Sequence, residues 1–212
     1  MSSAAAVRET HISWVFLIGD RAYKLKKPVR TAFLDFSTPQ ARRRMCERED
    51  ELNRRFSPDV YLGVATVLDP KGVPCDSIVV MRRMPDERRL ATLVQAGADV
   101  HDHLRRIARL IAAYHARAAT SPEISRPASL DSVRGNWEAN FEQMKQFYRP
   151  VLDAQSAKRI EHLVRTYLQG RASLFQERIA HGMARDGHGD LKADDIFCLD
   201  DRPRILDCIE FD

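Results

Sequence analysis

Three carboxylates in the last quarter of the sequence constrain the fold of this chain more than any other feature. Asp190 ends a His-Gly-Asp turn, and Asp195 comes five residues later, directly before a short apolar run. Residues 196–206 predict two short antiparallel strands joined by a turn at residues 200–203. Asp207 follows the second strand, so strand pairing places it beside Asp195 at the open end of the hairpin.

Two carboxylates that lie so close repel each other unless a cation lies between them. Carboxylate oxygens in such a position suit Mg²⁺ that carries nucleotide phosphates. The sequence therefore predicts that Asp195 and Asp207 bind Mg²⁺. Asp190 is then available to orient a hydroxyl group and to accept its proton.

Two segments of the sequence resemble a known family of kinases. Residues 186–191 (Asp-Gly-His-Gly-Asp-Leu) and 207–211 (Asp-Cys-Ile-Glu-Phe) are similar to the catalytic loop and metal-binding segment of the aminoglycoside phosphotransferase family. They look closest to a bacterial branch that often carries a fused Walker-type ATPase domain. The resemblance implies a protein-kinase-like α+β fold of two lobes, catalysis by Asp190 beside His188, and ATP and Mg²⁺ as cofactors. Asp195 stands where the family has Asn.

A basic strand predicts the lysine that binds the phosphates. Residues 11–17 and 21–27 alternate as two strands around a Gly-Asp turn. In the second strand, Lys24 and Lys26 point to the same face. Lys24 fits the kinase Ala-x-Lys pattern and Lys26 is the second candidate. The alternative is a basic edge strand that discourages aggregation.

The next element supplies a partner for these lysines. Thr38 predicts the N-cap of a helix in which Glu49 lies within an apolar stripe. A carboxylate in such a stripe is costly unless a cation pairs with it. We therefore expect Glu49 to pair with Lys24 or Lys26, and residues 42–44, all arginine, to lie on an exposed face. The expected stripe consists of Ala41, Met45, Leu52 and Phe56.

Two further strands lead to an expected hinge. Residues 60–68 and 77–81 predict the strands, and residues 82–85 fall where kinase-like folds connect their lobes. There we expect backbone groups to bind the edge of adenine, while Met81 or Met84 packs on its face.

The phosphate-covering loop departs from the usual pattern, because no G-x-G-x-x-G and no Walker sequence occurs in the chain. Residues 9–13 take its place, and we expect Thr10 or Ser13 to donate hydrogen bonds there. The strand before them is expected to be missing or reduced to residues 2–8. The chain also stops at Asp212, so the domain is expected to be truncated at both ends.

The rest of the chain is expected to be helical. Apolar stripes predict helices around residues 104–114, 133–148 and 155–179. We expect one kinase-like domain, with a sheet lobe over residues 1–85 and a helical lobe over residues 86–212.

Composition narrows the class of protein. Apolar residues make up 44% and charged residues 30% of the chain, which is typical of a soluble globular protein. The net charge of +4 is too modest to indicate nucleic acid. The four cysteines form no C-x-x-C pair, so we expect reduced cytosolic thiols, with Cys198 and Cys208 in the core. Without a signal peptide or a membrane span, we expect a cytoplasmic protein.

The function expected from the sequence is transfer of the γ-phosphoryl group of ATP to a hydroxyl of a small molecule. A fused or separate ATPase domain is the expected protein partner. The alternative is a nucleotide-binding pseudokinase that regulates such a partner, which the truncated ends and Asp195 favour. A basic RNA-binding protein is a third possibility, and it predicts an RNA affinity that falls steeply with salt.

Overall fold

The computed structural model describes residues 6–31, 34–148 and 151–210. Contacts divide the chain into two compact units, the first made of residues 1–110 with 188–212 and the second of residues 111–187. The lobe boundary expected after residue 85 stays a prediction, because the two compact units are defined by contacts and need not coincide with the two lobes of a kinase-like fold.

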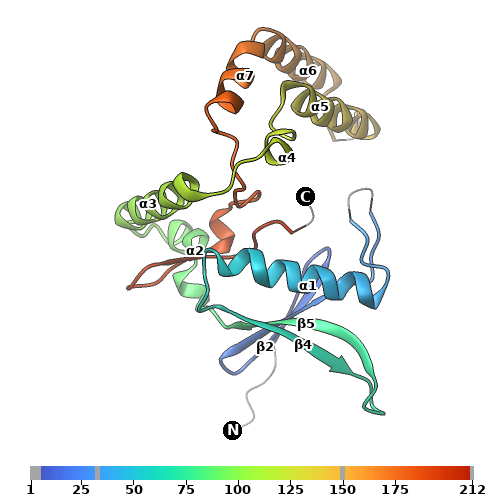
Figure 1. The fold of residues 1–212 in the computed structure, drawn as a ribbon, viewed down its shortest axis with the longest axis vertical. Coiled ribbons are helices and arrows are strands. Elements are labelled where there is room, and N and C mark those ends of the chain that lie inside the picture. The colour runs from blue at the N-terminus through green and yellow to red at the C-terminus, as the bar shows by residue number, and fades with distance from the viewer. Residues whose placement is uncertain (1–5, 32–33, 149–150, 211–212) are drawn as a thin grey trace. The chain divides into compact units, whose positions relative to one another are not determined.

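A five-stranded antiparallel sheet forms the basis of the first unit, with strand order β1-β2-β3-β5-β4 (Figure 1). The expected strands are present, and β5 is longer than expected. A strand also precedes the turn at residues 10–12, and it pairs with β2 along its whole length. The strands are β1 (Ala6–Glu9), β2 (Ser13–Ile18), β3 (Arg21–Lys26), β4 (Tyr61–Leu68) and β5 (Pro74–Arg82).

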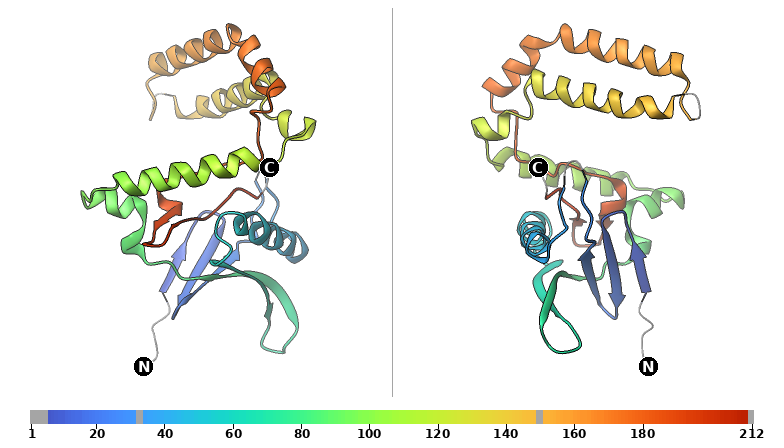
Figure 2. Two further views of the ribbon diagram at one scale, coloured as in Figure 1. Left: turned by 60° about the vertical axis from the view of Figure 1, so that its left-hand side comes forward. Right: turned by 90° about the vertical axis from the view of Figure 1, so that its right-hand side faces the viewer.

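Helix α1 (Pro39–Arg54) packs on β5 and β4 and begins as the sequence predicts. The Thr38 side chain accepts a hydrogen bond from the Ala41 N–H at 3.1 Å, which caps the helix. Both views of Figure 2 show α1 beside the sheet.

The buried face of α1 is more polar than expected. Arg42 was expected on an exposed face with its two neighbours, but it is buried and pairs with Asp76 of β5 at 2.8 Å. Its guanidinium also donates to the Phe36 carbonyl at 2.8 Å. The paired arginine can be buried because its charge is compensated. The buried residues of the helix are Arg42, Cys46, Glu49, Leu52 and Asn53, whereas Ala41 and Met45 are half-buried.

The expected C-terminal hairpin is present in the first unit. Strand β6 (Ile196–Cys198) follows the short 3₁₀ turn η3 (Ala193–Asp195) and pairs with β7 (Pro203–Ile205). Pro203 lies in the returning strand and not in the turn. Cys198 and Cys208 are fully buried, as the sequence predicts.

Short helices continue the first unit after β5. They are η1 (Asp86–Arg88), α2 (Leu90–Gln95) and the start of α3 (His101–Arg117), inside which the boundary between the units falls. The core on the sheet includes residues of strands β2 to β6, of helix α1 and of the segments next to β4 and β5: Leu17, Ala22, Cys46, Val60, Tyr61, Val79, Met81, Met84 and Phe197.

The second unit is helical. It contains α4 (Pro122–Ser125), α5 (Leu130–Met144), η2 (Lys145–Phe147), α6 (Ala154–Gln169) and α7 (Ala172–Ala180), and α5 lies alongside α6 in both views of Figure 2. The single helix expected over residues 155–179 is wrong, because the chain breaks at Gly170, a residue of low helix propensity.

The α+β expectation is confirmed by the antiparallel sheet and the helices around it. Among the described residues, no helix has both the length and the apolar character needed to span a membrane.

Candidate functional site

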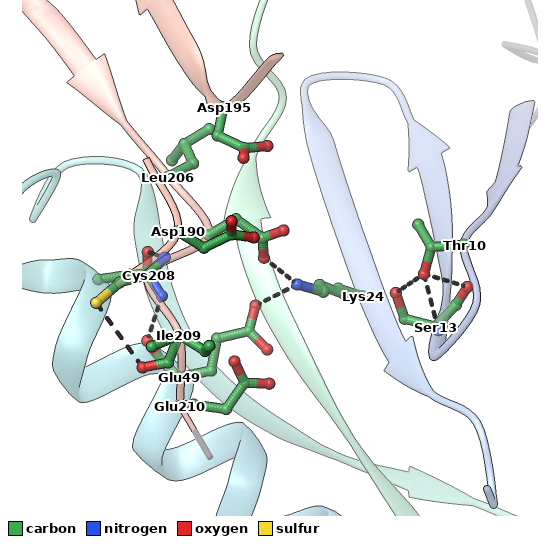
Figure 3. Close-up of polar contacts among 12 residues, drawn as sticks. Thr10, Ser13, Lys24, Glu49, Asp190, Asp195, Leu206, Cys208, Ile209 and Glu210 are labelled. Carbon is green, nitrogen blue, oxygen red and sulfur yellow. Dashed lines mark hydrogen bonds and ion pairs between the residues drawn. The ribbon is translucent and has the colours of Figure 1, made fainter. Parts of the chain in front are cut away.

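Lys24 lies at the centre of the candidate site. Strand alternation points Lys24 and Lys26 toward the buried face of β3, which α1 covers with Glu49. The Lys24 Nζ lies 2.8 Å from Glu49 Oε1 and 2.5 Å from Asp207 Oδ1 (Figure 3). Burial alone would lower the pKa of Lys24, but Asp207 and Glu49 outweigh it and raise that pKa well above its usual value.

Glu49 is shared by the two candidate lysines. Its Oε2 lies 2.7 Å from the Lys26 Nζ, so each carboxylate oxygen contacts one ammonium group. Glu49 is fully buried, which opposes its ionisation, but the two lysines keep its pKa below the usual value. The structure thus brings together both pairs that the sequence left as alternatives.

Asp207 has a backbone conformation that is uncommon outside glycine, with φ at 64°. The Asp207 N–H donates to the Tyr61 hydroxyl at 3.2 Å, and the next N–H, of Cys208, donates to Asn53 Oδ1 at 2.9 Å. The charge of Lys24 lowers the pKa of Asp207, so this carboxyl is ionised at neutral pH. Its side chain is about half-exposed, with a relative accessibility of 47%.

The predicted catalytic residue His188 holds the backbone near Asp207. Its Nε2 lies 2.9 Å from the Leu206 carbonyl, which can only accept, so this nitrogen carries the proton. Its own carbonyl accepts from the Ile209 N–H at 3.0 Å. The ring packs edge-on against Phe56, and burial lowers the pKa of His188. These contacts connect His188 to the backbone before and after Asp207, and its predicted catalytic role stays a prediction.

Asp190 and Asp195 flank Lys192 in the loop. The Lys192 Nζ lies 2.6 Å from Asp190 Oδ2 and 3.9 Å from Asp195 Oδ2. Gly189, with φ at 83°, allows the turn that exposes Asp190. Burial and then the nearby charge of Asp207 raise the pKa of Asp195 to about 6.

The residues of the hairpin fit a cation at Asp195 and Asp207. The Leu206 N–H donates to the Asp195 carbonyl at 2.9 Å, which continues the strand pairing up to the residue before Asp207. Asp195 Oδ2 is buried and has no hydrogen-bond partner among the described residues, so this oxygen could accept a cation. No group of three or more metal-binding side chains occurs in the described parts of the chain. The donor set therefore suits Mg²⁺ that takes its other ligands from phosphates and water.

A cleft of about 660 Å³ in the first unit collects most of the predicted site residues. Its size is that of a typical small-molecule site. The predicted residues that line it are Ser13, Lys24, Met81, Met84, Asp190, Asp195 and Asp207, and Glu210, which was not predicted, lines it as well. Lys26, Glu49 and His188 do not line the cleft and lie behind its wall. Of the two candidate lysines of β3, Lys24 is therefore the one that a bound ligand can reach.

The turn between β1 and β2 covers part of the cleft. The Ser13 N–H donates to Thr10 Oγ1 at 2.9 Å, and the two hydroxyl oxygens lie 2.8 Å apart (Figure 3). Both residues line the cleft, as expected of a phosphate-covering turn, although their hydroxyls already contact each other.

Several residues that support the site were not predicted from the sequence. Ser57 Oγ accepts from the Ile205 N–H at 3.0 Å and donates to the Ile205 carbonyl at 2.9 Å. With Asn53 and Tyr61, it ties the end of α1 and the start of β4 to the segment around Asp207. Asn53 lies four residues after Glu49 on the same helix face, which is a signal that the sequence did contain.

Comparisons with known proteins identify similar proteins but do not assign the chain to a family. No protein-family model matches the chain. It is 44% identical over 206 residues to the uncharacterized proteins Rv2004c and MT2060 of Mycobacterium tuberculosis and Mb2027c of Mycobacterium bovis. The match covers 97% of this chain and 41% of each relative, so the chain spans about two fifths of their length.

Two solved structures are similar to the chain at 18% identity. One is the GDP and kanamycin complex of APH(2")-IIia, with a TM-score of 0.47 over 93% of this chain and 62% of that one. The other is WbdD, with a TM-score of 0.34 over 55% of this chain and 27% of that one. Both scores are low, so function is inferred below from the geometry of the site and from the sequence motif.

Proposed function

We propose that this chain is a kinase-like phosphotransferase that transfers the γ-phosphoryl group of ATP to a hydroxyl of a small molecule. The observation that carries the proposal is the row of ion pairs from Glu49 through Lys24 to Asp207 at the wall of the cleft. Kinases use a buried glutamate to hold a lysine at the phosphates, and an aspartate nearby to hold the metal.

Each cleft residue has a role in this proposal. Lys24 binds the phosphates, and Asp190 orients the acceptor hydroxyl and takes its proton. Asp195 and Asp207 would hold Mg²⁺, which supplies charge neutralisation when it is bound. Positioning and charge neutralisation account for most of phosphoryl-transfer catalysis, so these few groups are sufficient in principle. Met81, Met84 and Ser13 would contact the nucleotide base and phosphates.

We also propose that the partner is a small-molecule acceptor, with neither nucleic acid nor a membrane involved. A fused or separate ATPase domain is the proposed protein partner. The relatives extend well beyond the matched region, so they have room for a further domain in the same polypeptide.

A nucleotide-binding pseudokinase is the second candidate. It is favoured by the Lys192–Asp190 ion pair at 2.6 Å, which engages the proposed base, and by the extra carboxylate of Asp195. Such a module would bind nucleotide and regulate its partner without turnover.

Calorimetric titration of ATP, with and without Mg²⁺, tests the proposal. It is made on the wild type, on Asp207→Ala, and on Asp131→Ala as a control at an exposed residue of α5. We expect binding that requires both Mg²⁺ and Asp207, and a control that behaves as the wild type. Binding that is indifferent to both favours the pseudokinase. No nucleotide binding, with RNA affinity that falls steeply with salt, would reject both in favour of an RNA-binding protein.

A further inference from the structure

Lys26 forms a second buried ion pair behind the wall of the cleft, with Glu210, a residue that also lines the cleft. Its side chain has a relative accessibility of only 1%, and its Nζ lies 2.7 Å from Glu49 Oε2 and 2.5 Å from Glu210 Oε1. The ammonium group also lies 5.1 Å from the centre of the Phe36 ring. Burying a lysine and two carboxylates is costly, and replacing them with apolar residues is often neutral or stabilising. Stability alone therefore does not explain this arrangement.

Glu210 places the pair next to the proposed metal site. It lies three residues after Asp207, and its side chain is 6% exposed. Lys26 consequently joins three parts of the chain: its own strand β3, helix α1 through Glu49, and the segment after β7 through Glu210. Figure 3 shows Glu210 and Glu49 next to each other in this region.

The segment around Asp207 needs such ties because its backbone is in a sparsely populated conformation. Before Asp207, the Leu206 N–H and carbonyl are bound to Asp195 and His188. After it, the N–H groups of Cys208 and Ile209 are bound, and Glu210 is held through its side chain by Lys26. The Lys26–Glu210 pair is thus the charged end of a continuous series of contacts.

Lys26 also limits the freedom of Glu49. A carboxylate held at one oxygen can swing about its bonds, whereas one held at both oxygens has a fixed plane. Because Lys24 contacts Oε1 while Lys26 contacts Oε2, the second lysine fixes the position at which Glu49 presents Lys24 to the cleft.

We propose that Lys26 and Glu210 are positioning residues that hold Asp207, and the Lys24–Glu49 pair, in the arrangement that binds metal and nucleotide. This inference rests on the proposed function for its catalytic meaning, but the positioning of the backbone can be measured without it. Positioning residues around metal ligands change metal affinity by about 10- to 100-fold when they are mutated.

The experiment compares Glu210→Gln with Glu142→Gln, the same change in an exposed lysine–glutamate pair of the second unit. We measure hydrogen exchange of the Cys208 and Ile209 amides, and ATP affinity with and without Mg²⁺. In Glu210→Gln we expect exchange of these two amides to accelerate about tenfold or more. The gain in ATP affinity that Mg²⁺ provides should fall about tenfold, with little change in metal-free affinity. The control should change neither quantity.

The double variant Lys26→Met/Glu210→Gln separates positioning from folding. Lys26→Met alone leaves buried charge uncompensated, so the double variant should regain unfolding stability relative to it. The gain in ATP affinity that Mg²⁺ provides should stay low in the double variant, because the Lys26–Glu210 ion pair is still absent. Recovery of both stability and Mg²⁺ dependence, or unchanged amide exchange in Glu210→Gln, would overturn the proposal. If wild-type protein binds no ATP while exchange still accelerates, the proposed function fails and the positioning of Asp207 stands.

Discussion

The Nε2 of His188 lies 2.9 Å from the carbonyl oxygen of Leu206, which joins the loop carrying Asp190 to the strand that ends beside Asp207. The base candidate and the metal-ligand candidate are therefore fixed to each other through one buried ring. A change at His188 should disturb both ends of the site.

His188→Ala should lower the free energy of unfolding by about 1–3 kcal/mol, because the Leu206 carbonyl loses the donor supplied by the buried His188 ring. It should also weaken Mg²⁺-dependent ATP binding. Chemical unfolding and calorimetry measure the two effects, with His162→Ala on the exposed face of α6 as the control. A variant as stable as the control would show that this hydrogen bond contributes nothing.

Asp190→Ala should reduce phosphotransfer by about 10²- to 10⁴-fold, the usual contribution of a general base. ATP affinity should stay close to the wild-type value, because in the proposed function the phosphates are bound by Lys24. The measurement is transfer of labelled γ-phosphate to a set of hydroxyl acceptors, with nucleotide binding determined in parallel. Wild-type turnover in this variant would exclude Asp190 as the catalytic residue.

Replacement of the two lysines of β3 by methionine should affect different quantities, mainly ATP binding at Lys24 and mainly stability at Lys26. Lys24→Met should abolish Mg²⁺-dependent ATP binding at a small cost in stability, because Glu49 keeps Lys26 and Asp207 is half-exposed. Lys26→Met should lower the free energy of unfolding by about 3–5 kcal/mol, because buried Glu210 loses its partner. Thermal unfolding and calorimetry on both variants check this, and equal effects on both quantities would contradict it.

Stability should depend on pH through Asp195, whose pKa is raised from 3.8 to about 6 in the folded state. Between these values the folded protein holds a proton that the unfolded chain has released. The free energy of unfolding should therefore fall as pH rises through this window and lose no more above it. In metal-free buffer, Asp195→Asn should be more stable than wild type at pH 7.5 by about 2–3 kcal/mol.

The stability difference between Asp195→Asn and wild type should shrink toward zero near pH 4. Urea unfolding across this range measures it, and Asp194→Asn, an exposed neighbour, provides the matched control. A difference that is independent of pH would show that Asp195 keeps an ordinary pKa.

Ser57→Ala should destabilise the hairpin by about 2 kcal/mol, because the buried Ile205 N–H and carbonyl both lose their partner. The exposed Ser173→Ala on α7 should leave stability unchanged. Hydrogen exchange at the Ile205 amide, compared between the two variants, shows whether the loss is local.

Local features of the sequence predicted much of the sheet and of α1. Strand alternation and the N-cap at Thr38 depend only on residues close in the sequence, so the tertiary fold changes these features little. The pairing of Glu49 with a lysine was also predictable, because a carboxylate at that position needs a cation. The lobe boundary and the roles of the cleft residues stay predictions.

The supporting contacts were not predictable in the same way. Ser57 and Ile205 are 148 residues apart, so their hydrogen bonds depend on the whole fold. The sequence predicts Arg42 to be one of three exposed arginines. Its burial depends on the ion pair with Asp76 of β5, which forms only in the tertiary fold. Around Gly170, the apolar periodicity of residues 155–179 predicts one continuous helix, whereas the glycine itself favours the break that the structure shows. Phe211, part of the family motif, lies outside the described residues.

Because Glu49 is bound by two lysines and Asp207 is half-exposed, the chain can lose Lys24 without leaving an unpaired charge in its interior. A descendant with another residue at position 24 would lose the proposed phosphate contact but keep the Lys26 pair that holds β3 to α1. If the proposed function holds, one substitution would then suffice to turn an enzyme into a non-enzymatic relative of the same shape. Evolution within such a lineage would be free to discard catalysis while retaining the scaffold.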